Sequence, residues 1–406
     1  MVAATYVYRV RDRSGKIISG AIEAESQTAV TSKLRQMGYI VLEISEKREA
    51  FSISLPGRKK KVKLKDLTVF SRQFATMINS GVSITRALAI LSEQVENPTL
   101  AAVITQVQKD VEGGLSLSEA LAKQEKIFPP IFVNMARAGE AGGVLDEVLL
   151  RIADHFESEA SLRARVKSAM TYPVAVFIFA ITIAFIMITF IVPIFMNMFS
   201  SLGGDLPGPT KMLVGLSNFI RGRWYIIFGT LMAFVYGFRA FKRNPRGRYI
   251  WDSFKLKMPV LGQLSRKMAI AKFARTFSTL ISSGVPILQA LDIVAETAEN
   301  AVVTKAIRES RASIKEGETI SKPLGASGVF PPMVVQMIAI GEETGALDSM
   351  LKKIADFYDG EVSATVDSLT SLLEPVLMVF MGVMIGGIVV SLYLPMFSVI
   401  SVLNQQ

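Results

Sequence analysis

An internal repeat constrains the fold of this chain more than any other feature of its sequence. The segment FSRQFATMINSGVSITRAL at residues 70–88 aligns with FARTFSTLISSGVPILQAL at residues 273–291. Further along each copy, GEAGGVLD at 139–146 aligns with GEETGALD at 341–348. Because several motifs recur in the same order, one folding unit occurs twice. The fold must therefore contain two equivalent halves.

Each copy of the repeat runs into a long apolar stretch. No charged residue occurs between Met170 and Gly204, or from Pro375 to the C-terminus. Both stretches are long enough to cross a bilayer as helices. Because Pro173 aligns with Pro375, the two stretches are equivalent. We expect each copy to be followed by one transmembrane helix.

A third apolar stretch, at residues 224–238, is short and is bracketed by Arg223 and Arg239. Read alone, it could lie at the membrane surface, because spanning requires the arginines to extend toward the headgroups or the bilayer to thin. Two equivalent bundles that feed equivalent spans in the same direction must, however, be separated by an even number of crossings. This stretch is the only candidate for the missing crossing, so we expect three spans and a parallel repeat about the membrane normal.

Basic residues beside the spans indicate the orientation. Arg163, Arg165 and Lys167 precede the first span, and 242–248 follows the short one with four further cations. Cytoplasmic flanks carry such an excess of Lys and Arg. The first apolar run begins deep in the chain, so we expect no cleavable signal. Both bundles and the N-terminus are therefore expected in the cytoplasm, with the chain held in a membrane.

Apolar residues within each copy recur at helical spacing, as at Leu67, Phe70 and Phe74. Gly81 and Gly284 fit the position after a helix, where a positive φ is needed. Stop signals of this kind predict six helices in each copy. The fold class is therefore mainly α: two repeated cytoplasmic six-helix bundles, each followed by a transmembrane helix.

A different unit precedes the repeats. Tyr6, Tyr8 and Val10 alternate as in a strand, a turn is expected at 12–15, and Ile18 and Ile22 follow on one face of a return strand. A helical stripe and a third strand complete a small ββαβ module. The expected boundaries are an N-terminal module at 1–46, a basic linker at 47–63, bundle 1 at 64–171, the first span at 172–198, a periplasmic loop at 199–223, the second span at 224–241, a connector helix at 242–272, bundle 2 at 273–373, the third span at 374–400 and a periplasmic tail at 401–406.

Composition excludes several classes of function. The chain has no cysteine and a single histidine, His155, so thiol chemistry, imidazole triads and multi-histidine metal sites cannot be assembled within it. It also lacks a G-x-x-x-x-G-K-[ST] phosphate loop. The net charge of +10 resides in short runs beside apolar spans, which favours attraction to membrane lipids over nucleic acid. We expect no enzyme activity, catalytic residue, cofactor or metal.

Three acidic residues are candidates for contact with partner proteins. Glu140 and Glu342 recur after glycine between helices, although a solvated cap or an interhelical pair is equally compatible with that position. Glu374 lies at the expected membrane boundary, where an ionisable group is costly. His155 is expected to pack, because the aligned residue in the other copy is Phe357. We expect structural roles at the repeated turn and helix-start positions, Gly81, Gly284, Pro130, Pro332, Pro173 and Pro375.

These motifs, together with the Phe-Pro-Pro triplets at 128–130 and 330–332 and Tyr172-Pro173, resemble the type II secretion F / type IV pilus PilC family over the whole chain. The resemblance implies an inner-membrane platform protein that engages a cytoplasmic hexameric ATPase, pilin or pseudopilin subunits and other components of the machine. It also implies calcium in some members. Asp154 matches an acidic position there, but Leu150 and Lys352 stand where a further carboxylate is needed, so we expect no metal.

Two other functions are compatible with a membrane protein of this kind. A scaffold for signalling enzymes would have similar bundles. A secondary transporter would also contain repeats, but the expected spans carry no ionisable residue at depth to bind an ion or polar solute. Duplicated bundles further predict a homo-oligomer, a dimer or higher.

Overall fold

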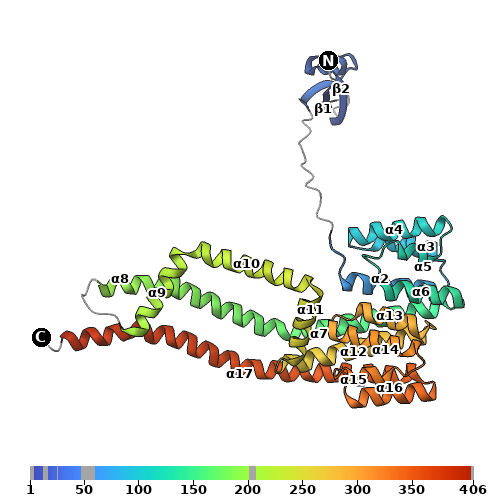
Figure 1. Cartoon of the computed structure of the whole chain (residues 1–406). Helices are drawn as coiled ribbons and strands as arrows, with labels where there is room; N and C mark the ends of the chain where they lie inside the picture. The colour runs from blue at the N-terminus through green and yellow to red at the C-terminus, as the bar shows by residue number, and fades with distance from the viewer. Residues whose placement is uncertain (1–3, 12–16, 25, 47–59, 201–206, 404–406) are drawn as a thin grey trace. The chain divides into compact units, whose positions relative to one another are not determined.

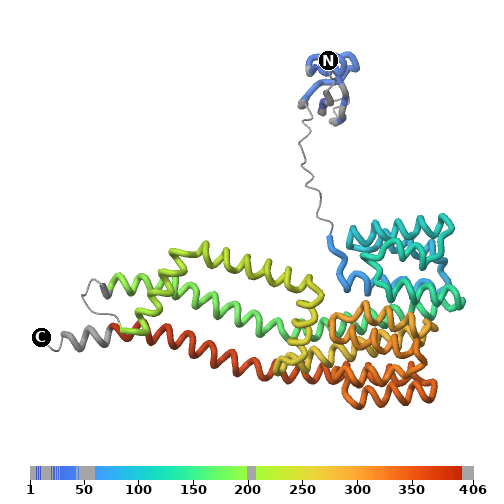
Figure 2. Tube along the Cα trace, viewed as in Figure 1, coloured from blue at the N-terminus to red at the C-terminus, as the bar shows by residue number. Residues whose placement is uncertain are grey.

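The structure is a computed structural model that describes residues 4–11, 17–24, 26–46, 60–200 and 207–403. The expected turn at 12–15, most of the basic linker and the last residues of the tail lie outside this part of the chain. The chain divides into two units, Met1–Lys59 and Lys60–Gln406, and each is described by itself. Figures 1 and 2 show the path of the chain.

The N-terminal unit is a three-stranded antiparallel sheet with one helix. Its elements are β1 (Ala4–Arg11), β2 (Ile17–Ala24), α1 (Gln27–Gln36) and β3 (Ile40–Glu46), in the sheet order β2-β1-β3. Tyr6 and Val10 from β1 pack against Val30 and Leu34 from α1 to form its core. Gly20 lies opposite Tyr8, and a Cβ at Gly20 would meet the Tyr8 hydroxyl at 2.6 Å. The glycine therefore makes room for the ring.

The second unit is helical over nearly all of its described length. The first copy of the repeat contains α2 (Leu64–Asn79), α3 (Ile84–Gln94), α4 (Pro98–Glu112), α5 (Leu117–Ala122), α6 (Pro130–Gly142) and α7 (Leu145–Ile186). There follow η1 (Met187–Ile191), α8 (Val192–Ser200), α9 (Gly208–Gly222), α10 (Trp224–Arg243) and α11 (Pro245–Lys257). The second copy contains α12 (Leu261–Ser282), α13 (Ile287–Thr297), α14 (Ala301–Lys315), α15 (Ser321–Ala326), α16 (Pro332–Thr344) and α17 (Leu347–Leu403).

Local sequence fixes the ends of these helices. Gly81 and Gly284 have φ of +83° and +80°, a left-handed conformation in which a side chain would be strained. Asn97 accepts hydrogen bonds from the first turn of α4, and Ser116 forms a capping box with Glu119 at the start of α5. Pro130 and Pro332 begin α6 and α16. A backbone N–H at this position has no acceptor within the helix, so proline, which lacks the N–H, costs no hydrogen bond there.

Apolar side chains of both copies form one hydrophobic core. In the first copy, the rings of Phe70, Phe74, Phe128 and Phe132 are fully buried and contact one another. In the second copy, Phe273, Phe277 and Phe330 repeat the arrangement. The aromatic pairs explain why the Phe-Pro-Pro and FxRxF motifs occur together in each copy, because the motifs meet in the core.

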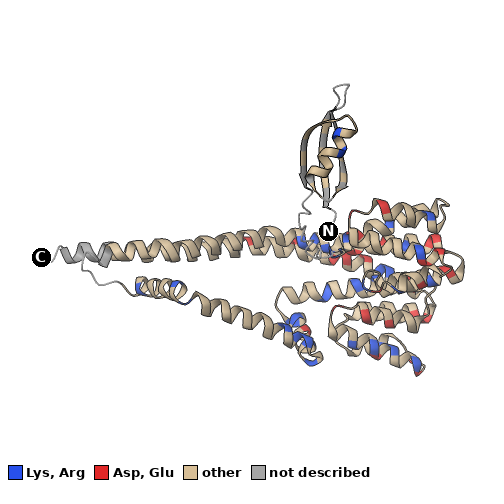
Figure 3. Ribbon diagram, turned by 90° about the horizontal axis from the view of Figure 1, so that it is seen from above, with Lys and Arg blue, Asp and Glu red and all other residues tan. Residues whose placement is uncertain are grey.

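The sixth helix of each copy continues without interruption into the apolar segment. α7 passes through Pro173 and α17 through Pro375, so the boundaries expected at 172 and 374 do not coincide with breaks in the helices. Figure 3 shows charged residues concentrated over the bundle helices and sparse along the distal parts of α7 and α17. Three described helical segments are long and apolar enough to cross a membrane: Leu145–Met198, Trp224–Arg243 and Leu347–Pro395.

Two expectations about the connecting segments were wrong. The segment 199–223, expected as a loop, contains α9, whose first turn carries Pro209 and whose Leu213 and Val214 pack on the apolar helices. The single connector helix expected at 242–272 is two helices, α11 and the first part of α12, separated at Val260 with φ of +66°. Pro259 disfavours the helical conformation of Met258, which explains the break.

A short π-helix interrupts the first apolar segment. η1 covers Met187–Ile191 and immediately precedes Val192 and Pro193. Proline has no N–H to donate to the carbonyl four residues earlier, and its ring crowds that carbonyl. Widening the preceding turn relieves the crowding, so Pro193 modifies this helix without ending it.

The apolar segments of α7 and α17 contact each other directly. Ala184 and Val192 share a buried cluster with Ile388 and Leu392. α9 crosses the distal end of this pair, where the Thr210 hydroxyl donates to the Ser391 carbonyl oxygen at 2.5 Å. By contrast, α10 buries no residue of its apolar window within the described structure.

Candidate functional site

The repeated G-E-x-x-G-x-L-D motif holds the α5–α6–α7 corner of each bundle. The Glu140 carboxylate accepts hydrogen bonds from the backbone N–H groups of Leu117 at 2.6 Å and Ser118 at 3.1 Å. These donors lie in the first turn of α5, where backbone N–H groups lack intrahelical acceptors. Glu140 therefore caps a neighbouring helix, and its negative charge interacts favourably with the partial positive charge at the N-terminus of that helix.

Glu342 makes the same contacts in the second copy. Its two oxygens accept from the N–H groups of Ile320 at 2.5 Å and Ser321 at 3.1 Å. Each glutamate acts within its own repeat, and both carboxylate oxygens are occupied by backbone donors. For these two residues the sequence left open a partner contact, a solvated cap or an interhelical pair, and in the structure each carboxylate binds the start of a neighbouring helix in its own copy.

The glycines of the same motif permit close contact between the helices. A Cβ at Gly139 would lie 3.0 Å from the Val148 Cβ, and one at Gly341 would lie 2.9 Å from the Leu347 Cα. Gly143 has φ of +70° and ends α6 in the left-handed region. The motif thus combines a cap, a close helix crossing and a helix end.

Glu374 lies apart from the other two glutamates. It is an exposed residue of α17, next to Pro375. The aligned residue of the first copy, Tyr172, is 60% exposed, and Pro173 is buried. The side chain at this position is exposed in both copies, but it is charged only in the second copy.

An arginine clamp ties the first and sixth helices of each bundle, and sequence reasoning missed it. Arg72 donates from Nε and Nη2 to the two carboxylate oxygens of Glu157 at 2.6 Å each, and from Nη2 to Asp154 at 2.5 Å. The hydrogen bonds from Arg72 lower the pKa of Glu157. Bidentate pairing of this kind also fixes the angle between α2 and α7.

The second copy repeats the clamp. Arg275 pairs with Asp359 at 2.5 Å and with Asp356 at 2.9 Å. The signal was present in the sequence, because Arg72 aligns with Arg275 and both acidic positions align as well. Asp154, the acidic residue at the position associated with calcium in the family, forms an ion pair with Arg72 in this structure. The described residues bring no three His, Cys, Asp or Glu together as a candidate metal site.

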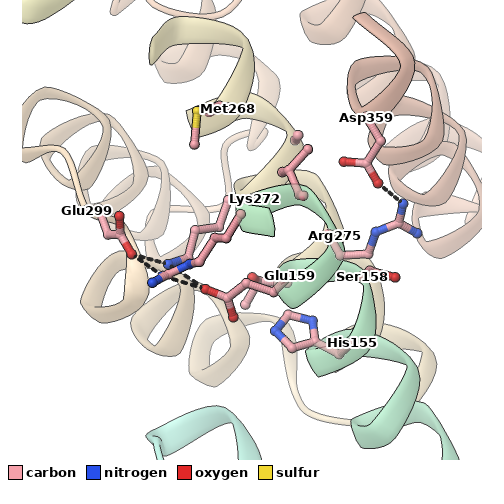
Figure 4. A pocket seen from close by; sticks show the side chains of 12 residues that line it. His155, Ser158, Glu159, Met268, Lys272, Arg275, Glu299 and Asp359 are labelled. Atoms are coloured by element: carbon pink, nitrogen blue, oxygen red, sulfur yellow. Dashed lines mark hydrogen bonds and ion pairs between the residues drawn. The ribbon is translucent and has the colours of Figure 1, made fainter. Parts of the chain in front are cut away.

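A pocket lies where α7 of the first copy meets α12 of the second, and Figure 4 shows its lining. Four charged side chains alternate in sign there. Glu159 accepts from Arg163 at 2.7 Å and Lys272 at 3.3 Å, while Glu299 accepts from Arg163 at 2.5 Å and Lys272 at 2.9 Å. Each charge has two partners of opposite sign, a network that holds the two bundles together.

His155 lies at the base of this pocket and is 6% exposed. Burial lowers the pKa of His155 to about 4; the nearby cations Lys272 and Arg275 act in the same direction and Glu159 opposes them. Its Nδ1 makes no hydrogen bond within the described structure. The ring contacts Phe156 edge-on, so the expected packing role agrees with its surroundings. None of these contacts activates a nucleophile or forms an acid–base pair.

The arrangement in each copy is thus a helical bundle continuous with an apolar helix, and it matches a known family twice. Residues 70–193 and 273–395 each match type II secretion system (T2SS) protein F, and residues 3–45 match the N-terminal domain of type II secretion system protein F. The chain belongs to the type II secretion system protein F family. The resemblance inferred from the repeated motifs is confirmed.

Relatives of this protein F family member come from both pilus and secretion systems. Type IV pilus assembly protein PilC of Thermus thermophilus is 43% identical over 404 residues, which is 99% of each chain. PilC of Myxococcus xanthus is 43% identical over 396 residues, 97% of this chain and 95% of its own. Type II secretion system protein F of Vibrio cholerae is 29% identical over 405 residues, 99% of this chain and 100% of its own. The chain is therefore a mostly helical membrane protein of a pilus or secretion machine.

Proposed function

We propose that this chain is the inner-membrane platform of a type IV pilus or type II secretion machine, and that it couples a cytoplasmic hexameric ATPase to the insertion or removal of pilin subunits. The observation that carries the proposal is the continuity of α7 and α17 from bundle to apolar segment. An uninterrupted helix transmits rotation or displacement along its axis, because a sharp kink in it requires disrupting backbone hydrogen bonds. In this proposal both bundles lie in the cytoplasm and the chain crosses the membrane three times.

The described contacts support mechanical coupling over chemistry. The arginine clamps and the capping glutamates fix the angles of the helices within each bundle, and the alternating ionic network joins the two bundles. The candidate spans pack through apolar side chains. These features favour a rigid coupler over a secondary transporter, which needs polar groups at depth. The similarity to pilus assembly proteins favours it over a signalling scaffold.

Interrupting one helix tests the coupling. Two glycines inserted between Lys167 and Ser168 would make α7 flexible after the bundle and before the apolar segment. The same insertion after Gly222, at the junction of α9 and α10, is the control, because the helices already break there. We expect the α7 insertion to abolish fibre assembly, although the variant is present at the normal level and inserts into the membrane normally. The control insertion should leave fibre assembly intact.

Co-purification tests the partners. The tagged full chain, extracted from native membranes, should recover the ATPase and the pilins of its machine, and the α7 insertion should still recover both. Normal fibre assembly with the α7 insertion would contradict the rigid-coupler mechanism. Recovery of neither partner would favour the signalling scaffold, and solute uptake dependent on the chain would favour the transporter.

A further inference from the structure

The turn between α10 and α11 brings the last residues of the second apolar helix against the start of α11. Asn244 caps α11, because its side chain accepts from the Arg246 N–H at 3.1 Å, and Pro245 occupies the first turn. A Cβ at Gly247 would overlap the Phe241 carbonyl oxygen, so only glycine allows so close an approach. Figure 3 shows Lys and Arg gathered at this junction.

An open groove of about 850 Å³ lies between this junction and helices α13 and α14. Five cations and two carboxylates line it: Lys242, Arg243, Arg248, Lys305, Arg308, Glu296 and Glu309. Positive charges therefore exceed negative charges by three. The volume lies within the range of sites that hold a small ligand.

Aromatic rings hold Lys242 at the edge of this groove. Its Nζ lies 4.6 Å from the centroid of the Phe238 ring and 5.1 Å from the centroid of the Trp251 ring. A ring attracts an ammonium group through its quadrupole but carries no net charge. The two rings therefore orient Lys242 and leave its positive charge uncompensated.

The arginines of the groove are also poorly compensated. Arg243 and Arg308 are exposed, and neither forms an ion pair with any residue that the structure describes. Arg248 lies 3.8 Å from the Asp252 carboxylate, but that carboxylate also lies 3.7 Å from Lys255. The groove thus carries positive charge that its own residues do not neutralise, and it attracts an anion.

The position of the groove favours a lipid headgroup over a soluble anion. Lys242 and Arg243 form the last turn of α10, one of the three candidate spans. Ile250 and Phe254 lie one turn apart on α11 and are 59% and 55% exposed. Exposed apolar side chains beside cations are typical of helices that lie at a membrane surface. The placement rests on the proposed topology, in which this end of α10 reaches the cytoplasmic leaflet.

We propose that this groove binds the phosphate headgroup of an anionic phospholipid. Lys242 and Arg243 from α10 and Arg308 from α14 donate charge-assisted hydrogen bonds to the phosphate oxygens. The acyl chains run along the surface of α10, whose apolar window buries no residue within the described structure. Because α14 belongs to the second copy of the repeat, the bound lipid holds that bundle against the membrane surface.

Lipid titration of the purified full chain tests the proposal, with native mass spectrometry to count bound lipids. We expect phosphatidylglycerol to bind saturably, and phosphatidylcholine of the same chain length to bind more weakly. Arg243→Gln with Arg308→Gln should weaken phosphatidylglycerol binding by about fivefold for each charge removed. Arg86→Gln with Lys109→Gln removes two exposed cations of the first bundle and should leave binding unchanged. Equal weakening in both double variants would overturn the proposal.

A third variant should act in the opposite direction. Glu296→Gln removes a carboxylate from the lining of the groove and should strengthen phosphatidylglycerol binding. A variant that folds poorly does not gain affinity, so this outcome depends on the groove itself. Unchanged or weaker binding, with unchanged thermal unfolding, would contradict the proposed site.

Soluble glycerol phosphate distinguishes a lipid site from a site for free phosphate, because it presents the same phosphate without acyl chains. We expect it not to displace phosphatidylglycerol at equal concentration, and displacement would overturn the assignment to lipid. An acidic segment of a partner protein is the other possible occupant. Loss of co-purified partners from Arg243→Gln with Arg308→Gln, with lipid binding intact, would assign the groove to that contact instead.

Trp251 gives a second readout of lipid at the junction. Trp224→Phe leaves Trp251 as the only tryptophan of the chain. In nanodiscs, brominated phosphatidylglycerol should quench its fluorescence more than brominated phosphatidylcholine at the same mole fraction, and Arg243→Gln with Arg308→Gln should remove the difference. Equal quenching by both lipids in the parent chain would contradict the proposal. Neither lipid measurement depends on fibre assembly, so their failure would leave the α7 insertion test of mechanical coupling unaffected.

Discussion

At the scale of single residues, duplicated polar side chains hold helices to one another. Glu140 and Glu342 each bond two backbone N–H groups of a short helix, and Arg72 and Arg275 each bond two carboxylates. Short helices such as α5 are marginal by themselves, so a cap from outside the helix decides whether they form. Recurrence in both copies therefore reflects the duplicated fold before any partner is considered.

We expect Glu140→Ala to destabilise the folded chain by about 1–3 kcal/mol, because two N–H groups at the start of α5 lose a charged acceptor. Glu93→Ala, at an exposed glutamate of α3, is the matched control and should change stability by less than about 0.5 kcal/mol. Denaturant unfolding of the purified protein in detergent measures both. Unchanged stability with lost fibre assembly would instead assign Glu140 to partner contact.

His155 should make stability depend on pH. Its pKa of about 4 in the folded protein lies below the ordinary value of 6.5, so protonation favours unfolding. The contribution is fully present above pH 6.5 and is lost as the pH falls toward 4. Between pH 7 and pH 5 the loss amounts to roughly 2 kcal/mol, at 1.4 kcal/mol for each pH unit below 6.5.

Replacing the histidine by the residue of the other copy isolates this effect. His155→Phe should flatten the unfolding free energy between pH 7 and pH 5, measured by denaturant titration. Phe357→His, at the exposed equivalent position, should leave the wild-type profile unchanged. An undiminished slope in His155→Phe would mean that other groups, such as Glu159 or Glu299, carry the pH dependence.

At the scale of helices, close crossings set the geometry of each bundle. α6 and α7 approach so closely at Gly139, and α16 and α17 at Gly341, that a methyl group does not fit without movement of the neighbour. Long uninterrupted helices then carry this geometry outward through Pro173 and Pro375. The corner at the G-E-x-x-G-x-L-D motif thereby determines how each bundle is joined to its span.

Two glycine substitutions should act in opposite directions. Gly341→Ala places a Cβ against the backbone of Leu347 and should destabilise the chain by about 1–3 kcal/mol. Gly360→Ala, in the middle of α17 with open space around it, should stabilise by about 0.5–1 kcal/mol, because alanine favours the helix. Thermal or denaturant unfolding distinguishes them, and equal effects would mean that α16 and α17 are not closely packed.

At the scale of the whole molecule, the repeat constrains how many times the chain can cross the membrane. In the proposed topology, equivalent bundles on helices that run in the same direction require α10 to return the chain across the membrane. α10 has the length for this, since it is a 20-residue helix, and its last turn ends in Lys242 and Arg243.

Labelling of single cysteines in spheroplasts tests the topology. Lys109→Cys in the first bundle and Arg308→Cys in the second should react with a membrane-impermeant maleimide only after lysis. Met212→Cys in α9, which is 80% exposed, should react before lysis. Reaction of Lys109→Cys and Arg308→Cys under opposite conditions would mean that α10 lies on the membrane surface.

The sequence by itself determined the duplication, the apolar segments and the family, because repetition of motifs and hydropathy are properties of the order of residues. Helix ends at Gly81, Gly284 and Pro130 were also readable, since capping and backbone conformation depend on a few adjacent residues. The connecting segments were predicted less well, as the helix α9 and the break at Val260 show.

Only the tertiary structure decided which polar residues meet. Glu140 binds a turn about twenty residues away, and Arg72 binds carboxylates on a distant helix. The alternating network of Glu159, Lys272 and Glu299 joins different copies of the repeat. These pairings could not be predicted from the sequence alone. The free energy of an ion pair depends on the separation and burial of its two charges, and the packing of the whole chain sets both. The same packing brings the two copies into contact through residues that are not equivalent in the alignment, such as Asn134 of the first copy and Gln289 of the second.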